Sequence, residues 1–295
     1  MKVLIIGGVS AGTKAAAKLK RCDRAADVTI ITQDVDISYA GCGLPYYVGG
    51  LIDSREELIV NTPQKYAALT GVSVLTGREA VKIDAEGKSV TAMNLNTGEQ
   101  EAYAYDELII ASGASASLPP IEGTGKTGVF TVRKPDDAIS IRSYVDANSV
   151  RKAVVVGAGF IGLEMAENLQ ARGVSVTILE MEAQVMPNVL DPEMADYVRR
   201  HLVSKGFRVL TGTSASAVLG EKEVDGVMTS VGRIPAELVV FAAGIRPNTA
   251  FLADSGLEMF KGTILTNEKL MTNLPNIYAI GDCAMVTNRI TGKPQ

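Results

Sequence analysis

Two copies of one pattern, strand, glycine turn, helix and strand, place the strongest constraint on how this chain folds. β-branched runs that end at glycine predict strands, and the segments after the glycines predict helices. The first copy comprises residues 3–6, 11–20 and 28–32, and the second comprises residues 153–156, 160–171 and 174–180. Each copy is a predicted βαβ unit, and together they predict an α/β fold with two dinucleotide-binding units.

The second glycine turn, residues 157–162, matches the pattern G-x-G-x-x-G in full. Gly157 permits a tight turn, Gly159 lets a pyrophosphate approach the backbone, and Gly162 lets helix and strand pack closely. The start of the helix would face the phosphates. A loop in which the glycines only make a turn is the alternative, but the strand, the helix and an acidic residue all occur at the expected spacing.

That acidic residue, Glu180, stands at the end of the strand that follows the helix. Its carboxylate would accept a hydrogen bond from a ribose 2'-hydroxyl and repel a 2'-phosphate, which favours NADH over NADPH. Two nearby basic residues, Lys152 and Arg172, leave NADPH open, because either could reach a 2'-phosphate.

The first glycine turn, residues 7–12, departs from the pattern because Val9 takes the place of the middle glycine. The strand after it ends in Thr32-Gln33-Asp34, so that Asp34 or Gln33 would take the role of the acidic ribose ligand. Dinucleotide binding is therefore expected here too, on a weaker pattern.

Three further strands are expected between the two units, at residues 72–76, 89–95 and 107–111. Pro119-Pro120 and the segment 244–248 mark two points at which the chain passes between domains. We infer two domains, the second inserted into the first: residues 1–115 with 245–295, and residues 116–244.

The charge balance argues against nucleic acid and membranes as partners. The chain has 29 basic and 33 acidic residues, a net charge of −4, and no basic block that would attract nucleic acid or anionic lipid. Gly7 and Gly8 interrupt the apolar N-terminal run, so this run is too short for a secretory signal. The three cysteines have no regular spacing, which agrees with a reducing compartment, and a cytoplasmic location is expected.

Cys42 lies in the run S-Y-A-G-C-G-L-P-Y-Y, residues 38–47. The other cysteines, Cys22 and Cys283, are too far away in sequence for a local CxxC-type disulfide. A redox-active Cys42 would therefore find its partner sulfur or oxygen outside the chain. A buried, inert thiol is the alternative for Cys42, and no role is assigned to the other two cysteines.

With this run, the segment A-S-G at 111–113 and the segment Y-A-I-G-D at 278–282, the chain resembles the flavoprotein pyridine nucleotide-disulfide oxidoreductases of the single-cysteine branch. That branch includes coenzyme A-disulfide reductases, NAD(P)H-dependent persulfide reductases, and NADH oxidases and peroxidases. The resemblance spans essentially the whole chain. It implies two Rossmann-like domains of the three-layer ββα type, the second inserted in the first.

The resemblance implies FAD in the first unit, NADH or NADPH in the second, and no metal. The residues expected around FAD are Gly7, Gly12, Asp34, Ser112, Gly113, Gly281 and Asp282. Asp282 would bond the ribityl chain or a phosphate. The residues expected around the nicotinamide nucleotide are Gly157, Gly159, Phe160, Gly162, Glu164, Glu180 and Gly244.

Two of these residues have specific roles by resemblance. Phe160 would cover the nicotinamide-binding face of the flavin until the cofactor enters, and Glu164 would lie near the nicotinamide. Core packing at the start of a helix is the alternative for Phe160.

Three further positions bear on the substrate. The oxidases and peroxidases carry a histidine in the first glycine turn, where this chain has Ser10, so a sulfur substrate is favoured over oxygen or peroxide. The single histidine, His201, lies in a predicted helix, residues 194–205, and is expected to be structural. Arg21 matches a residue that contacts coenzyme A phosphates in the disulfide reductases, and its fork suits phosphate. An interaction with the helix dipole is the alternative for Arg21.

The chemistry expected of Cys42 is thiol–disulfide exchange. Pro45 suits the first turn of a helix whose positive end would face the sulfur. NADH would reduce the flavin, the flavin would reduce a disulfide between Cys42 and a small thiol, and the freed thiolate would attack the next disulfide or persulfide. Ser38, one helical turn before Cys42, would hydrogen-bond the entering or leaving sulfur.

The predicted function is therefore FAD-dependent NAD(P)H:disulfide oxidoreduction, with coenzyme A disulfide or a coenzyme A-type persulfide as substrate. Three alternatives stay open. They are an NADH oxidase or peroxidase that cycles Cys42 through sulfenic acid, an NADH:rubredoxin-type electron-transfer reductase, and a non-enzymatic dinucleotide-binding module.

Members of the family that the chain resembles continue into a dimerisation domain, whereas this sequence stops at Gln295. We expect a truncated form that lacks this domain and has impaired activity. The full-length form is expected to be a homodimer.

Overall fold

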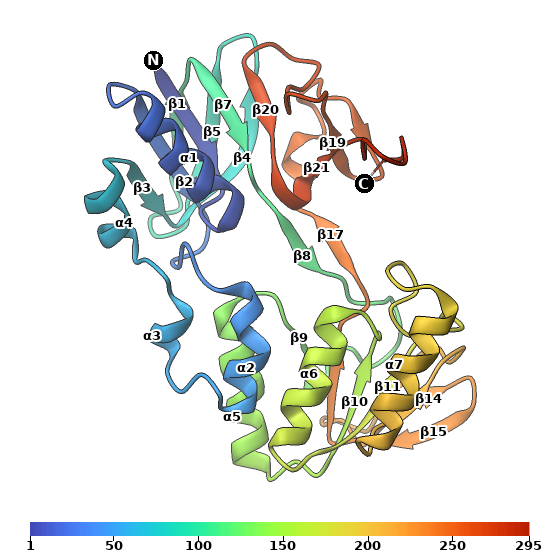
Figure 1. The fold of residues 1–295 in the computed structure, drawn as a ribbon. Coiled ribbons are helices and arrows are strands. Elements are labelled where there is room, and N and C mark those ends of the chain that lie inside the picture. Colours follow the sequence, from blue (N-terminus) through green and yellow to red (C-terminus); the bar gives the residue numbers. More distant parts are fainter. Residues whose placement is uncertain (295) are drawn as a thin grey trace. The chain divides into compact units, whose positions relative to one another are not determined.

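The computed structural model describes residues 1–294, which divide into two compact units (Figure 1). Unit 1 consists of Met1–Tyr39, Ile59–Ser115 and the chain from Arg246 onward, and unit 2 consists of Ala40–Leu58 and Ala116–Ile245. One unit is thus inserted in the other, as expected. Two boundaries differ from the expected ones: the segment Ala40–Leu58 and residue Ile245 were expected in the first domain and belong to unit 2.

A parallel sheet of five strands forms the centre of unit 1, in the order β20-β7-β1-β2-β3. In that order the strands are Ile277–Ala279, Glu107–Ile110, Lys2–Ile6, Asp27–Thr32 and Ser73–Thr76. The helix α1, Ser10–Cys22, connects β1 to β2, and Val3 of β1 pairs with Val28 of β2 in parallel register. The first predicted βαβ unit is confirmed.

Side chains of β1 alternate between two cores, one on each face of this sheet. Val3 and Ile5 pack against α1 and against α4, Pro63–Thr70. Leu4 and Ile6 pack on the other face with a three-stranded antiparallel sheet. Its strands are β4 (Arg78–Asp84), β5 (Ser89–Asn94) and β6 (Gln100–Ala104). Unit 1 therefore has the three-layer ββα arrangement that the resemblance implied.

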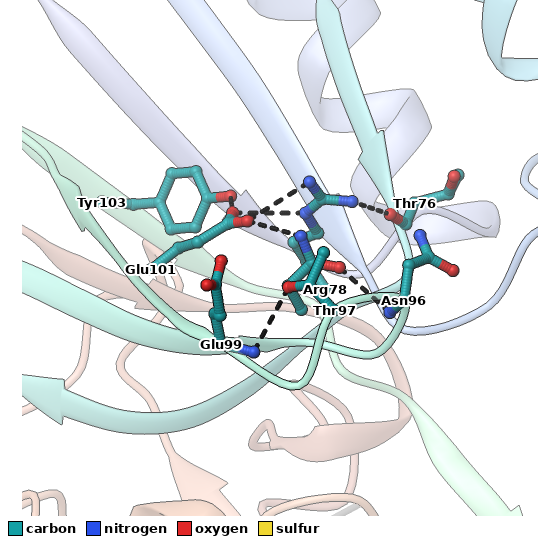
Figure 2. Close-up of polar contacts among 8 residues, drawn as sticks. Thr76, Arg78, Asn96, Thr97, Glu99, Glu101 and Tyr103 are labelled. Carbon is teal, nitrogen blue, oxygen red and sulfur yellow. Dashed lines mark hydrogen bonds and ion pairs between the residues drawn. The ribbon is translucent and has the colours of Figure 1, made fainter.

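A charged cluster ties the three antiparallel strands together (Figure 2). Arg78 on β4 donates to both carboxylate oxygens of Glu101 on β6, at 3.2 and 3.3 Å, and Asn94 on β5 donates to one of them at 2.6 Å. The Tyr103 hydroxyl also donates to this carboxylate. The hydrogen bonds, that from Tyr103 first, lower the pKa of Glu101. The cluster therefore stabilises unit 1 above the ordinary pKa of glutamate and weakens as the pH falls through the lowered one.

The chain passes between the two units a second time before and after residues Ala116–Ile245. The chain leaves unit 1 after Ser115 and returns at Arg246, close to the two predicted crossing points. Two short strands at these positions, β8 and β17, pair with each other. The elements in this part of the chain are β8 (Ala114–Ala116), β17 (Ile245–Pro247), η2 (Ala250–Leu252), β18 (Met259–Phe260), β19 (Thr263–Leu265), η3 (Gly281–Cys283) and β21 (Ala284–Met285).

Unit 2 repeats the architecture of unit 1. Its parallel sheet has the order β12-β11-β10-β16-β9, with strands Arg208–Leu210, Ser175–Leu179, Lys152–Val156, Leu238–Phe241 and Val129–Thr131. The helix α6, Phe160–Ala171, connects β10 to β11 and confirms the second predicted βαβ unit. Val154 and Val239 face a second, antiparallel sheet of β13 (Ala215–Leu219), β14 (Gly226–Thr229) and β15 (Gly232–Pro235).

Two further helices of unit 2 complete its description. They are α5, Pro135–Asn148, and α7, Pro192–Ser204. No helix within residues 1–294 is both long and apolar enough to cross a membrane.

The segment Ala40–Leu58 belongs to unit 2 because its apolar side chains find their partners there. It contains the 3-10 turn η1 (Gly41–Gly43) and the helices α2 (Leu44–Gly49) and α3 (Arg55–Leu58). Leu44, Pro45 and Val48 are buried, and α2 packs against α5 and α6. Alternation and glycine spacing carry no information about such a partner, which explains why the sequence did not predict this placement.

The tight turn after β1 predicts a large effect of one methyl group. Gly7 has a φ of 110°, and an added Cβ would lie 2.0 Å from the carbonyl oxygen of Ala111. We expect Gly7→Ala to lower the free energy of unfolding by about 2–4 kcal/mol, since both overpacking and left-handed backbone are costly. Urea denaturation measures this. Gly125→Ala, at an exposed position with open space around an added Cβ, is the matched control and should change stability by less than about 0.5 kcal/mol.

Candidate functional site

The two glycine turns have the same backbone geometry, although only one of them matches the full pattern. The first glycine of each turn has a positive φ, 110° at Gly7 and 108° at Gly157. An added Cβ on Gly12 or Gly162 would lie 1.9 Å from the carbonyl oxygen of the first glycine of its own turn. In both turns the strand and the helix therefore approach so closely that only glycine fits this backbone.

The starts of the two helices leave backbone N–H groups for a ligand. Neither α1 nor α6 has a side-chain cap or an acidic residue in its first turn. An added Cβ on Gly159 would meet no atom within 4 Å, so the space beside the turn of unit 2 is open. Such a turn fits a pyrophosphate, which accepts hydrogen bonds from these N–H groups. At the equivalent position of unit 1, Val9 is half-buried and its carbonyl oxygen accepts the hydroxyl of Thr13.

Ser112 supplies an independent sign of a ligand in unit 1. Its hydroxyl oxygen is buried and has no hydrogen-bond partner among residues 1–294. A buried hydroxyl without a partner costs about 1–3 kcal/mol, so a polar ligand group at this point would stabilise the unit. The carbonyl oxygen of Ser112 accepts a hydrogen bond from Asn248 Nδ2 at 3.1 Å. Sequence reasoning missed Asn248, although it lies in the predicted crossing segment 244–248.

The structure brings two distant segments of the expected FAD site together. Gly281 has a φ of 74°, and an added Cβ would lie 3.0 Å from the Cβ of Ala11 in the first glycine turn. Asp282 follows in the 3-10 turn η3 and is exposed. Asp34 is half-buried just after β2, and Gly113, with a φ of 66°, comes just after β7. These residues follow the carboxyl ends of neighbouring parallel strands, where ligands bind in sheets of this kind.

Arg21 lies at the other end of α1, in its last turn, and is exposed. Its neighbour Lys20 donates to the carbonyl oxygens of Arg24 and Ala26, both at 2.9 Å, just after the helix. Basic side chains at this end agree with the helix-dipole alternative. Contact between Arg21 and a coenzyme phosphate stays a prediction.

In unit 2, Glu180 is tied to the glycine turn. Its side chain is 7% exposed, with Oε2 accepting the backbone N–H of Ala158 at 2.8 Å and Oε1 accepting that of Glu182 at 2.9 Å. Each carboxylate oxygen keeps a second lone pair that could accept a ribose hydroxyl. The carboxylate thus holds the turn in shape and lies at the position expected of a ribose ligand.

The expectation that Lys152 or Arg172 could reach a 2'-phosphate is wrong. Lys152 is the first residue of β10, whose five residues extend about 16 Å toward the turn. Arg172 follows the last residue of α6, about 18 Å from its start, and pairs with Asp146. Both basic groups lie at the end of the sheet and helix opposite to the glycine turn.

Phe160 and Glu164 occupy the first turns of α6. The side chain of Phe160 is 61% exposed, so core packing does not account for it. Partial burial, and to a lesser extent the negative charge of Glu167, raises the pKa of the Glu164 carboxyl. Gly244, with a φ of 106°, is exposed, and an added Cβ there would meet no atom within 4 Å.

Cys42 is exposed, so the buried thiol of the alternative is not found, and its redox activity stays a prediction. Cys22 is exposed too, and Cys283 is buried, with its sulfur 3.3 Å from the carbonyl oxygen of Ile280. Pro45 lies in the first turn of α2 as predicted, but Cys42 precedes this six-residue helix, in η1. A short helix of this kind provides little dipole at the sulfur.

The helical turn expected between Ser38 and Cys42 is absent. Ser38 has a left-handed backbone with a φ of 49°, and its hydroxyl accepts a hydrogen bond from Asn61 Nδ2 at 3.4 Å. Ser38 also belongs to unit 1, whereas Cys42 belongs to unit 2. A hydrogen bond from Ser38 to the reacting sulfur therefore stays a prediction without its expected geometry. His201 is exposed in the last turn of α7, in the helix predicted for it.

Comparison with known proteins connects both units and the cysteine segment to one family. The sequence pattern of the family described as pyridine nucleotide-disulphide oxidoreductase matches residues 1–295. An NADH oxidase of Methanocaldococcus jannaschii is 36% identical over 293 residues, or 99% of this chain and 65% of the relative. An NAD(P)H coenzyme A polysulfide/persulfide reductase of Pyrococcus horikoshii is 35% identical over 293 residues, or 99% of this chain and 64% of the relative.

A solved structure shares the fold. The NAD-dependent persulfide reductase from A. fulgidus is 38% identical and superposes with a TM-score of 0.96, covering 100% of this chain and 56% of that one. The chain therefore spans less than two thirds of the length of each of these proteins.

The buried carboxylate at the glycine turn predicts a loss of stability on amidation. In Glu180→Gln only one oxygen remains to accept two backbone N–H groups, so one N–H is left without an acceptor. We expect the free energy of unfolding at pH 7 to fall by about 1–3 kcal/mol, measured by urea denaturation. Glu182→Gln is the matched control, because that side chain is exposed, and it should leave the free energy of unfolding almost unchanged. Equal stability of the two variants would contradict the role given to Glu180.

The raised pKa of Glu164 predicts that replacing this carboxyl by an amide stabilises the protein in a pH-dependent way. Because the folded protein holds this proton more tightly than the unfolded chain, stability falls as the pH rises from the ordinary glutamate pKa through the raised one. Glu164→Gln should therefore melt at a higher temperature than the natural protein at pH 7, and the difference should vanish in acid below the ordinary pKa. Glu167→Gln removes only the smaller cause and should give a smaller gain. A melting difference that is constant with pH would rule out this explanation.

Proposed function

Since this chain belongs to the pyridine nucleotide-disulphide oxidoreductase family, we propose that it forms the nucleotide-binding part of an FAD-dependent NAD(P)H:disulfide oxidoreductase. The proposed substrate is coenzyme A disulfide or a coenzyme A-type persulfide, reduced through Cys42. The observation that carries the proposal is an exposed thiol in a chain that also has two glycine turns of nucleotide-binding geometry. Unlike Cys22, which is also exposed, Cys42 lies in the S-Y-A-G-C-G-L-P-Y-Y run that resembles the family's redox segment, which favours an enzyme over a dinucleotide-binding module without activity.

Unit 1 is the proposed FAD-binding unit. The first glycine turn offers the backbone N–H groups of α1 to the pyrophosphate, and the buried hydroxyl of Ser112 gains a partner. Gly281 and Asp282, which lie beside this turn, approach the same ligand, and Asp34 approaches the ribose. The flavin, when bound, supplies the transfer of two electrons from the nicotinamide nucleotide to the sulfur.

Unit 2 is the proposed NAD(P)H-binding unit. The N–H groups at the start of α6 bind the pyrophosphate, and Glu180 accepts the ribose 2'-hydroxyl while it holds the turn. The basic residues Lys152 and Arg172 lie too far from the turn to favour a 2'-phosphate, so we propose NADH as the preferred nucleotide. The exposed ring of Phe160 is free to stack on a planar ligand.

Cys42 carries the sulfur chemistry in this proposal. Its thiolate attacks one sulfur of a disulfide R–S–S–R, forms a Cys42–S–S–R bond and releases R–S⁻. Two electrons and a proton then cleave the mixed disulfide, which returns the Cys42 thiolate and releases R–SH. With a persulfide R–S–SH the thiolate would attack the outer sulfur, forming Cys42–S–SH and releasing R–S⁻. Two electrons and a proton would then cleave the Cys42–S–SH bond, returning the Cys42 thiolate and releasing hydrogen sulfide.

A second candidate function is an NADH oxidase that cycles Cys42 through sulfenic acid. The similarity to a protein named NADH oxidase favours it. Ser10 in the first glycine turn favours the reductase, because the histidine expected of the oxidases is missing there. We further propose a homodimer located in the cytoplasm.

The proposed thiol mechanism predicts a selective loss of activity. In the flavin-loaded protein, Cys42→Ser should lower the NADH-dependent reduction of coenzyme A disulfide and persulfide by at least about 10³-fold, because the serine hydroxyl does not exchange with disulfides. Reduction of ferricyanide by NADH should be unchanged, since it does not pass through the sulfur. Spectrophotometry of NADH consumption measures both.

Cys22→Ser removes the other exposed thiol and is the control, expected to leave both rates unchanged. Disulfide reduction that survives in Cys42→Ser would refute the mechanism. Oxygen consumption that matches the rate with coenzyme A disulfide would favour the oxidase.

A further inference from the structure

Cys42 is the middle residue of η1, and its neighbours in this turn, Gly41 and Gly43, have no side chains that could pack around it. Its own side chain is exposed. Its position therefore depends on how the segment Ala40–Leu58 is held. The two ends of the segment are joined by a hydrogen bond from the N–H of Ala40 to the carbonyl oxygen of Leu58 at 2.7 Å.

Within the segment, Gly43 is the point at which Cys42 meets packed structure. An added Cβ on Gly43 would lie 3.1 Å from Cδ1 of Ile52 and 3.2 Å from Cδ2 of Leu58, so these two side chains pack closely around the backbone next to Cys42. The N–H of Ile52 donates in turn to the carbonyl oxygen of Tyr46 in α2, at 3.2 Å. A shift of Ile52 would therefore displace the turn that carries Cys42.

Ile52 is held from outside the segment by one charged side chain. Nη1 of Arg142, on α5, donates to the carbonyl oxygens of Tyr47 at 3.2 Å, Ile52 at 3.1 Å and Asp53 at 3.2 Å. The guanidinium also lies 4.7 Å from the centre of the Tyr47 ring, a cation–π contact. One planar cation thus binds the last turn of α2 and the loop after it, where backbone carbonyl groups of a helix end need donors.

We propose that Arg142 is a positioning residue for Cys42, which fixes the segment so that the thiolate can meet a disulfide in line. The inference rests on the proposed thiol function for its catalytic consequence. It goes beyond that function because Arg142 lies in no nucleotide or cysteine motif, a hundred residues from Cys42 in sequence. Arginine suits this position because its planar guanidinium stacks on the Tyr47 ring while Nη1 donates to the three carbonyl oxygens, whereas lysine would keep the charge and the donors but lose the planar stacking.

The test compares Arg142→Gln, Arg142→Lys and the control Arg55→Gln in the flavin-loaded protein. Arg55 makes a contact between the same segment and α5, with Asp136 at 3.8 Å, but both side chains are exposed and the pair should contribute little. Hydrogen exchange of the peptide amides at 41–53 reports how firmly the segment is held. NADH-dependent rates with coenzyme A disulfide and with ferricyanide report the consequence for the sulfur.

In Arg142→Gln we expect amide exchange at 41–53 to accelerate about tenfold or more. The kcat with coenzyme A disulfide should fall by about 10-fold to 100-fold, the cost of a misplaced reacting group, with the ferricyanide rate unchanged. Arg142→Lys should lie between the natural protein and Arg142→Gln, and it serves as the test if Arg142→Gln does not fold. Arg55→Gln should change none of these values.

Unchanged exchange at 41–53 in both Arg142 variants would overturn the inference, as would faster exchange with an undiminished disulfide rate. An equal loss of the disulfide and ferricyanide rates would also overturn it, because it would indicate general damage. Failure of the proposed function is seen separately, as disulfide reduction that survives Cys42→Ser, while the exchange measurement still decides whether Arg142 holds the segment.

Discussion

The contact on which the rest of this structure depends is the approach of a glycine to the end of a neighbouring parallel strand. An added Cβ on Gly7 would lie 2.0 Å from the carbonyl oxygen of Ala111, just after β7, and one on Gly157 would lie 2.4 Å from that of Ala242, just after β16. Only a residue without a Cβ can turn the chain there. The turn brings each helix start to the carboxyl edge of its sheet, and the buried layers on both faces of each sheet build on that placement.

The two units share this turn geometry and differ in the few polar groups that lie beside it. In unit 2, the carboxylate of Glu180, just after β11, accepts the N–H of Ala158 in the glycine turn and that of Glu182 in its own loop. In unit 1, Ser112 lies just after β7, and its carbonyl oxygen accepts a hydrogen bond from Asn248 Nδ2. The buried hydroxyl of Ser112 is available to a ligand. The same backbone geometry therefore carries two different sets of polar groups, which is how one architecture can bind two nucleotides.

The proposed redox cysteine, Cys42, is not part of either glycine turn. Cys42 lies in a segment that leaves unit 1 in sequence and packs in unit 2, where α5 and α6 cover the apolar side of α2. An exposed thiol can be reached by a substrate, but its reaction slows when backbone motion moves the sulfur out of position. If Cys42 carries the proposed reaction, the rate would thus depend on Arg142, which we propose holds the segment without touching the substrate.

The sequence by itself determined both βαβ units, the inserted arrangement, the three-layer sheets by resemblance, and the helices that carry Phe160 and His201. These features follow from local periodicity and from glycines whose need for space is a property of the backbone. Only the tertiary structure decided that Ala40–Leu58 packs in unit 2 and that no helical turn joins Ser38 to Cys42. The position of Lys152 and Arg172 at the far end from the glycine turn follows from the rise per residue of a strand and a helix that the sequence had already predicted. The placement of Ala40–Leu58 depends on which apolar faces bury each other, and local periodicity does not contain that information, because α2 packs against helices about a hundred residues away in sequence.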